Sequence, residues 1–259
     1  MIEILLLLSG LSSGFIGSIL GVGGGIFLMP LLVMGLDLNV KEAVGISLFC
    51  VVGTSIAAMQ KSLNNGFYCL RVSMFLEIFA ILGAILSSCL SYRINSNLSM
   101  LLFGFFLLLL SFLITIFDIN KSYKSLNCDQ INISISFRII SLAFVSFLMG
   151  VLTGTFGIGG GVLMVPILVI IGNISISSAV KISLCLMLTS GSVALSVYFA
   201  KGSVSLNLAM ISFLGVFPAS LFGSKIREHL NEETIKIIFS IFIMLLGLTI
   251  IFFKLGSLI

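Results

Sequence analysis

Charged side chains are scarce in this sequence, and their scarcity excludes most classes of soluble protein. Only 8% of the 259 residues are Asp, Glu, Lys or Arg, whereas an ordinary soluble domain has about 25%. The 13 basic and 9 acidic residues cannot cover a fold of this size with a charged shell. The composition therefore excludes a soluble enzyme, a secreted disulfide scaffold and a protein that binds nucleic acid.

The residues that usually carry metal or thiol chemistry are also few. The sequence holds a single histidine, His229, and five cysteines that are scattered without a CxxC pair. Cys50, Cys89 and Cys185 fall inside apolar runs, so we expect them to be small buried apolar side chains. A membrane-embedded enzyme would need His, Cys or acidic residues clustered around one cavity. We therefore predict neither a metal site nor an enzyme.

Long apolar runs take up most of the chain. Apolar residues make up 59% of the sequence, and the mean hydropathy is +1.31. Continuous runs of this kind suit membrane-spanning helices of about 20 residues. The first charge is Glu3 and no basic residue precedes the leucine run, so we do not expect a cleaved signal peptide. We predict an all-α polytopic protein of the inner (plasma) membrane that crosses the bilayer several times.

The chain divides into two related halves. A polar linker at residues 118–138 separates a first membrane repeat, 1–117, from a second, 139–259. An ungapped offset of 136 residues aligns Gly21-Val-Gly-Gly-Gly with Gly157-Ile-Gly-Gly-Gly, and it also aligns the two AVxISL segments at 43–48 and 179–184. Across residues 14–88 the two copies share 18 identities in 75 positions. An internal duplication of this kind is common in transporters.

The glycine-rich segments are predicted to break membrane helices. As one straight helix, residues 4–36 would be about 50 Å long, whereas the hydrocarbon layer is about 30 Å thick. Three successive glycines disfavour a helix, and the freed amides of a half-helix N-terminus attract anions. The predicted anion-binding glycines are Gly23, Gly24, Gly25, Gly159, Gly160 and Gly161, and the predicted helix-breaking prolines are Pro30 and Pro166. The alternative is close packing of helices at small-xxx-small positions. A dinucleotide site is excluded because Ile26 and Val162 fill the third glycine position of its fingerprint.

Polar side chains inside the runs are the remaining candidates for a site. Two hydroxyl positions recur under the same offset, Ser47 with Ser183 and Thr54 with Ser190, and hydroxyls are suitable donors for an oxyanion. The alternative is that they bond to their own helix backbone or to a neighbouring helix.

Glu77 is the one acidic residue well inside a run. Acids within a membrane are functional candidates, so Glu77 is a candidate for proton coupling. Otherwise it pairs with Arg71 or Arg93. Its counterpart in the second repeat is Phe213, so it does not belong to the duplicated core.

Positive charges indicate how the chain crosses the membrane. If each glycine-rich run is a re-entrant hairpin that returns to its starting side, nine Lys and Arg residues lie on one side and four on the other. The rule that positive loops stay in the cytoplasm then places the linker in the cytoplasm and both termini outside. Each half crosses three times beside its broken helix, so the halves are inverted repeats.

The paired GxGGGxxxxP segments, each followed by a helix rich in small and hydroxyl residues, resemble the TauE/SafE sulfite exporter family, the TSUP transporters. The resemblance covers nearly the whole chain outside the linker. It implies a membrane transporter of small sulfur-containing anions such as sulfite or organosulfonates, and in some members of other organic anions, with no prosthetic group. We therefore expect a secondary transporter of sulfite, thiosulfate or organosulfonates, and the two repeats predict that it works by alternating access. One departure is visible, because Asn65 and Lys201 stand where members often carry a His before glycine.

The implied partners are a small anionic substrate and the lipid bilayer, with no nucleic acid, and a homo-oligomer is left open. The alternatives are a transporter of other organic anions such as carboxylates, and a membrane scaffold that transports nothing.

Overall fold

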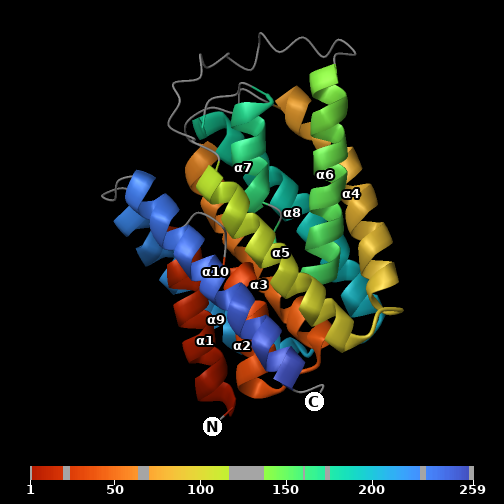
Figure 1. The fold of residues 1–259 in the computed structure, drawn as a ribbon, viewed down its shortest axis with the longest axis vertical. Coiled ribbons are helices and arrows are strands. Elements are labelled where there is room, and N and C mark those ends of the chain that lie inside the picture. Colours follow the sequence, from red (N-terminus) through yellow and green to blue (C-terminus); the bar gives the residue numbers. More distant parts are fainter. Residues whose placement is uncertain are drawn as a thin grey trace.

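The computed structural model describes residues 2–19, 24–63, 70–116, 137–159, 161–172, 176–227 and 232–256. All regular secondary structure within these ranges is α-helical, as predicted (Figure 1). The helices are α1 (Ile2–Ile19), α2 (Gly25–Leu36), α3 (Val40–Leu63), α4 (Leu70–Ser91), α5 (Ser96–Ile116), α6 (Phe137–Phe156), α7 (Gly161–Ile170), α8 (Ile176–Ala200), α9 (Leu206–Arg227) and α10 (Glu232–Gly256). Residues 118–136 of the predicted linker lie outside the described ranges, and α6 already begins at Phe137.

The helix bounds repeat with the offset found in the sequence. Adding 136 to the bounds of α4, Leu70 and Ser91, gives 206 and 227, which are the bounds of α9. Adding 136 to the first residues of α2, α3 and α5 gives 161, 176 and 232, where α7, α8 and α10 begin. The helices of residues 2–116 (the first half) therefore each have a counterpart in residues 137–256 (the second half).

Helix packing follows the same duplication, and it joins the halves closely. In the first half α2 packs on α3, and in the second half α7 packs on α8. The first helix of each half packs on the fourth helix of the other half, so that α1 lies against α9 and α6 lies against α4. The counterparts α3 and α8 pack on each other, as do α5 and α10, and α3 and α8 lie among the other helices in Figure 1.

The counterpart helices that touch run in opposite directions. Ser111 of α5 donates its hydroxyl to the carbonyl of Ser240 at 2.9 Å, while Gly104, earlier on α5, lies against Gly247, later on α10. In the same way Gly45 of α3 lies near Tyr198, late on α8, whereas Val52 of α3 lies near Gly191, earlier on α8. Both pairs are therefore antiparallel.

Small residues allow close approach along the two seams between the halves. A Cβ atom on Gly14 of α1 would lie 2.5 Å from the carbonyl oxygen of Val216 on α9. A Cβ atom on Gly154 of α6 would lie 2.7 Å from the carbonyl oxygen of Ala84 on α4. These distances are shorter than van der Waals contact, so only glycine fits. At these glycines the close-packing alternative is correct.

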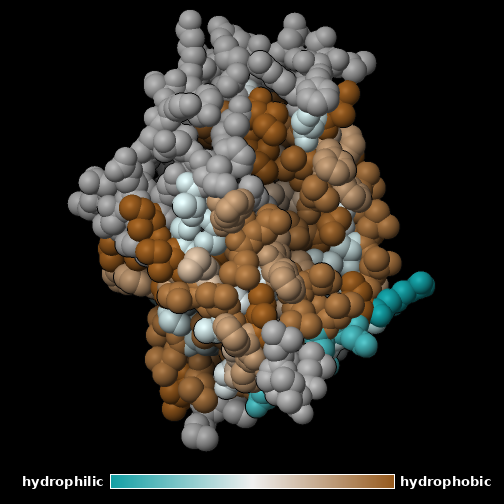
Figure 2. All heavy atoms as spheres, viewed as in Figure 1, coloured by the Kyte–Doolittle hydropathy of each residue, from teal (hydrophilic) through white to brown (hydrophobic). Residues whose placement is uncertain are grey.

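The outer faces of the helices are apolar. Met74 and Ile78 on α4 are 62% and 57% exposed, and Phe105 and Phe112 on α5 are 61% and 66% exposed. Figure 2 shows apolar side chains over most of the described surface on one face, with the most hydrophilic ones at its lower edge. Among the residues that the structure describes, three helical segments are long and apolar enough to span a membrane, namely Val72–Ser91, Ser178–Ala200 and Leu206–Gly223. This surface suits contact with lipid chains rather than water.

Candidate functional site

After the first glycine-rich segment the chain folds back along α1. Gly24 is buried and caps the N-terminus of α2, where its carbonyl accepts the N–H groups of Phe27 and Leu28. A Cβ atom on Gly24 would lie 3.0 Å from the carbonyl oxygen of Ser13. In a continuous helix, residues 13 and 24 would be about 16 Å apart along the axis. The predicted helix break therefore exists, and the chain folds back on itself after α1.

The second glycine-rich segment does the same after α6. That helix ends at Phe156, and Gly157 takes the left-handed conformation with φ +69°. Its N–H group donates to the carbonyl of Thr153 at 3.0 Å. The chain then returns, because Ser146 of α6 lies 4.0 Å from the sulfur of Met164 on α7, and a continuous helix would separate these residues by about 27 Å.

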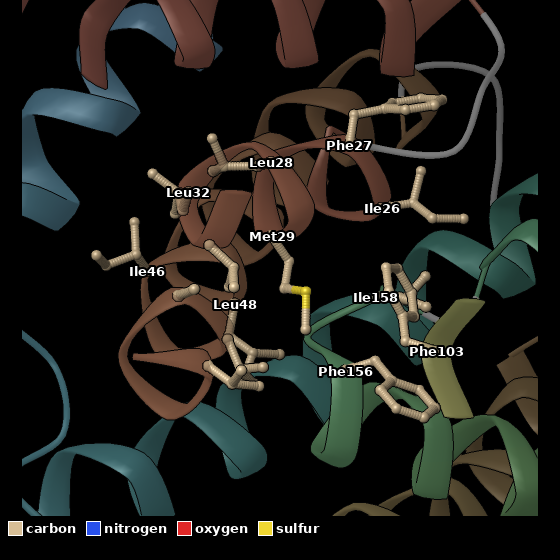
Figure 3. Packing of buried hydrophobic residues seen from close by; sticks show 14 of the residues in the cluster. Ile26, Phe27, Leu28, Met29, Leu32, Ile46, Leu48, Phe103, Phe156 and Ile158 are labelled. Atoms are coloured by element: carbon tan, nitrogen blue, oxygen red, sulfur yellow. The ribbon is translucent and has the colours of Figure 1, made fainter. Parts of the chain in front are cut away.

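The two breaks meet inside the protein. A Cβ atom on Gly25, the first residue of α2, would lie 2.8 Å from the carbonyl oxygen of Gly157. The neighbouring side chains of Ile26 and Ile158 belong to one buried cluster, and Figure 3 shows this cluster between α2 and the end of α6. One broken segment from each half therefore contributes to a single buried place beside α3 and α8.

Ser47 of α3 connects the two breaks. Its side chain is fully buried, and its hydroxyl oxygen lies 3.0 Å from the carbonyl of Gly25 and 2.9 Å from the carbonyl of Gly157. A hydroxyl has one proton, so the two carbonyls share it. In this conformation the predicted anion donor is bonded to main chain from both halves.

Ser183 of α8 has the matching position in the second half. A Cβ atom on Gly161, which begins α7, would lie 2.8 Å from the Ser183 hydroxyl oxygen. A Cβ atom on Gly25 would lie 3.0 Å from the Ser47 hydroxyl oxygen. The same offset thus relates both pairs, and a buried serine lies beside the start of each returning helix.

Gly159 completes the described part of the site. A Cβ atom there would lie 2.6 Å from a methyl group of Val51. The carbonyl of Gly159 accepts the N–H group of Gly161 at 2.5 Å. The breaks are thus closely surrounded by α3 side chains. Gly23 and Gly160 lie outside the described residues.

The other two predicted hydroxyls bond within their own helices. Thr54 donates to the carbonyl of Val51 at 3.0 Å, and Ser190 donates to the carbonyl of Leu186. These bonds match the backbone-bonding alternative. The structure thus brings Ser47 and Ser183 to the broken segments, whereas it gives the hydroxyls of Thr54 and Ser190 partners in their own helices.

The prolines lie within the returning helices instead of at the breaks. Pro30 is buried inside α2, which continues around it to Leu36, and Pro166 lies within the range of α7. Because proline has no N–H group, each removes one bond from its helix. The breaks occur earlier, at the glycines, and each proline is the sixth residue of the helix that follows the break.

Glu77 belongs to α4, which packs on α8. Its carboxylate accepts a hydrogen bond of 3.0 Å from Ser73, one turn earlier on α4. Cys185 of α8 interacts with both Ser73 and Glu77, and sequence reasoning did not find this neighbour because it needs the packing of α4 on α8. Arg93 is 16 residues further along, about 24 Å in helical rise, so the pairing with Arg93 is wrong. The side chain of Arg71 lies outside the described part.

Comparison with known proteins shows which family the sequence matches. The family model described as "Sulfite exporter TauE/SafE" matches residues 6–250. The chain is similar to "Probable membrane transporter protein YunE" of Bacillus subtilis, with 25% identity over 96% of this chain and 97% of the relative. It is also similar to "Probable membrane transporter protein MJ0441" of Methanocaldococcus jannaschii, with 29% identity over 94% and 93%. No solved structure matches the chain.

Proposed function

Since the chain belongs to the TauE/SafE sulfite exporter family of membrane transporters, we propose that it is a secondary transporter of small sulfur-containing anions such as sulfite, thiosulfate or organosulfonates. The observation that carries the proposal is the meeting of the two glycine breaks. Gly25 from the first half and Gly157 from the second half touch at a buried place that both halves build. A substrate site between two repeats, made from broken helices, is the usual arrangement in secondary transporters.

The chemistry of this place suits an anion. The returning helices α2 and α7 both begin here, at Gly25 and Gly161, and helix N-termini carry partial positive charge and free N–H groups. The N–H group of Gly161 donates to the carbonyl of Gly159 in this conformation, and in our proposal the anion replaces that carbonyl. Ser47 and Ser183 lie beside the two starts and supply hydroxyl donors. Sulfite and sulfonate oxygens accept such bonds.

Alternating access would work by separating the two breaks. The bond from Ser47 to the carbonyl of Gly157 joins the first half to the second, so it opposes any movement that opens this place. In our proposal the anion takes over the Ser47 proton when the halves part. Rocking of one half against the other would then expose the site to each side of the membrane in turn.

The halves are proposed to be inverted repeats in a multi-pass plasma-membrane protein. Two copies related by an axis along the membrane normal have parallel counterpart helices, whereas an axis in the membrane plane makes them antiparallel. The antiparallel contacts of α5 with α10 and of α3 with α8 support the second arrangement. The return of α2 along α1 and of α7 along α6 supports the re-entrant hairpins.

Flux of radiolabelled sulfite into proteoliposomes tests the transport proposal. We expect saturable uptake that excess thiosulfate or taurine inhibits and excess acetate does not. Inhibition by acetate would instead indicate a carboxylate transporter. No flux of any anion from protein that elutes as a folded species would contradict transport and favour a scaffold.

Two variants of α2 test the site itself. Gly25→Ala places a methyl group against Gly157, so we expect a folded protein that has lost at least nine tenths of the flux. Gly35→Ala is the matched control, because a Cβ atom there meets nothing within 4 Å, and its flux should equal that of the unaltered protein. Equal flux in both variants would contradict a role for the breaks.

A further inference from the structure

The duplication places two equivalent helix crossings in the protein, and their side chains differ. In the crossing of α9 on α3 the contact is aromatic. Phe49 and Phe213 pack edge to face, with ring centroids 5.8 Å apart and planes at 81°. Gly53 makes room for this pair, since a Cβ atom there would overlap the Phe213 ring. This crossing is apolar.

The equivalent crossing of α4 on α8 is polar at every one of the same positions. Adding 136 to positions 49 and 53, and subtracting 136 from 209 and 213, gives four counterparts. In the aromatic crossing the set is Phe49, Gly53, Ala209 and Phe213, and in the polar crossing it is Cys185, Thr189, Ser73 and Glu77. We call the second set the α4–α8 polar cluster.

Three members of the α4–α8 polar cluster, Ser73, Glu77 and Cys185, interact through their side chains, and the fourth, Thr189, bonds to its own helix backbone. Ser73 is 1% exposed and donates to the Glu77 carboxylate at 3.0 Å. Cys185 is 5% exposed and interacts with both of them, and Thr189 donates to the carbonyl of Cys185 at 3.0 Å. The cluster therefore joins two helices that pack together, within segments that are each apolar enough to span the membrane.

Packing alone does not require these polar residues. A charged side chain inside a membrane helix carries a large insertion cost. The aromatic crossing demonstrates that the same backbone arrangement is filled by apolar side chains in the other half. The Glu77 carboxyl group is present at only one of the two equivalent crossings, in spite of its insertion cost. Its charge therefore points to a function.

We propose that Glu77 binds and releases one proton in each transport cycle, and that the α4–α8 polar cluster is the proton-binding site that couples anion movement to a proton gradient. This proposal rests on the proposed transport function. The carboxylate takes a proton from water on one side and becomes a neutral carboxylic acid. On the other side it returns the proton to water and becomes a carboxylate again. No other bond changes.

The neighbours of Glu77 favour a proton over a metal cation. Sodium and other hard cations prefer a shell of oxygen ligands, and the sulfur of Cys185 is a poor one. The ionisable groups on α8 are Cys185, Lys181 one turn before it, and Tyr198 near the end of the helix. Within the described parts of α6 and α7 no ionisable side chain lies between residues 140 and 170. The side chains of Arg71 and Arg138 lie outside the described part.

Accumulation of sulfite in proteoliposomes under an imposed pH gradient, with the membrane potential clamped at zero, tests the coupling. For one proton per anion, a gradient of one pH unit should change the accumulation ratio of the unaltered protein about tenfold. Glu77→Gln should abolish this change while it retains exchange of labelled for unlabelled sulfite. Glu77→Asp should restore the response. Phe213→Leu, the matched control at the aromatic crossing, should leave the response unchanged.

Two outcomes would overturn the proposal. One is a Glu77→Gln protein that still responds to the pH gradient, and the other is an unaltered protein that responds to a sodium gradient instead. A measurement without transport separates this proposal from the proposed function. Infrared difference spectra of the purified protein should contain a carboxyl band that titrates with pH and is lost in Glu77→Gln. A band unaffected by the substitution would refute proton binding even if sulfite flux is normal.

Discussion

Replacing Ser47 by alanine tests the contact that joins the two halves. The substitution removes one buried hydroxyl that is shared by the carbonyls of Gly25 and Gly157. A buried carbonyl without its donor costs about 1–3 kcal/mol, while hydrogen bonds between membrane helices average about 0.6 kcal/mol and reach about 1.7. We therefore expect Ser47→Ala to lower the free energy of unfolding by about 1–2 kcal/mol.

Ser55→Ala is the matched control for this measurement. Ser55 lies on the same helix and is 1% exposed, but its hydroxyl donates to Val51, a carbonyl of its own helix. That carbonyl keeps its helical N–H donor, so the loss should stay below about 0.5 kcal/mol. Unfolding of both variants in mixed micelles with a rising fraction of denaturing detergent measures the difference. Equal losses for Ser47→Ala and Ser55→Ala would refute the reasoning that the shared bond holds the breaks together.

Two further predictions concern glycines. Gly83→Ala places a methyl group against the backbone of α6, so we expect the free energy of unfolding to fall by about 1–3 kcal/mol in the same measurement. Gly35→Ala, in open space, should instead raise it by up to about 1 kcal/mol through better helix propensity. A small loss at position 83 would contradict close packing of α4 on α6. Gly157→Ala and Gly202→Ala both force alanine into the left-handed region, at about 1–2 kcal/mol each. Only position 157 also meets neighbouring backbone, at 2.9 Å, so it should lose more stability, and equal losses would indicate that the break is loosely packed.

The sequence was sufficient for the broad architecture because that architecture depends on repeated patterns. The offset of 136 aligned the glycine motifs, and the helix bounds repeat with the same offset. The break at Gly24 follows from the low helix propensity of glycine and the length of the apolar run. These properties are local, so they can be predicted without knowing which helices touch.

The candidate site was harder to predict because a hydroxyl in a helix has two kinds of partner. Ser47 and Thr54 are seven residues apart on the same helix, and both are matched by hydroxyls in the second half. Ser47 bonds to the broken segments, whereas Thr54 bonds to its own backbone at Val51. Only the positions of the neighbouring helices decide between these partners.

The α4–α8 polar cluster was out of reach for a similar reason. Glu77 was identified as unusual from its charge alone, and its counterpart Phe213 was known. That α4 with Glu77 packs on α8 with Cys185, while Phe213 of α9 packs on Phe49 of α3, depends on the packing of the fourth helix of one half on the third helix of the other. The sequence offers no signal for that pairing.

The exchange of first helices between the halves has a consequence for synthesis of the protein. During translation α1 emerges first, yet its packing partner α9 begins at Leu206, after α2 to α5 of the first half and α6 to α8 of the second have been made. The face of α1 around Gly10 and Gly14, which packs on α9, must therefore stay in contact with lipid until the chain is nearly complete. Neither half is an autonomous folding unit. An ancestral single repeat with this packing would have needed to form a dimer in which the first helix of each copy packs on the fourth helix of the other.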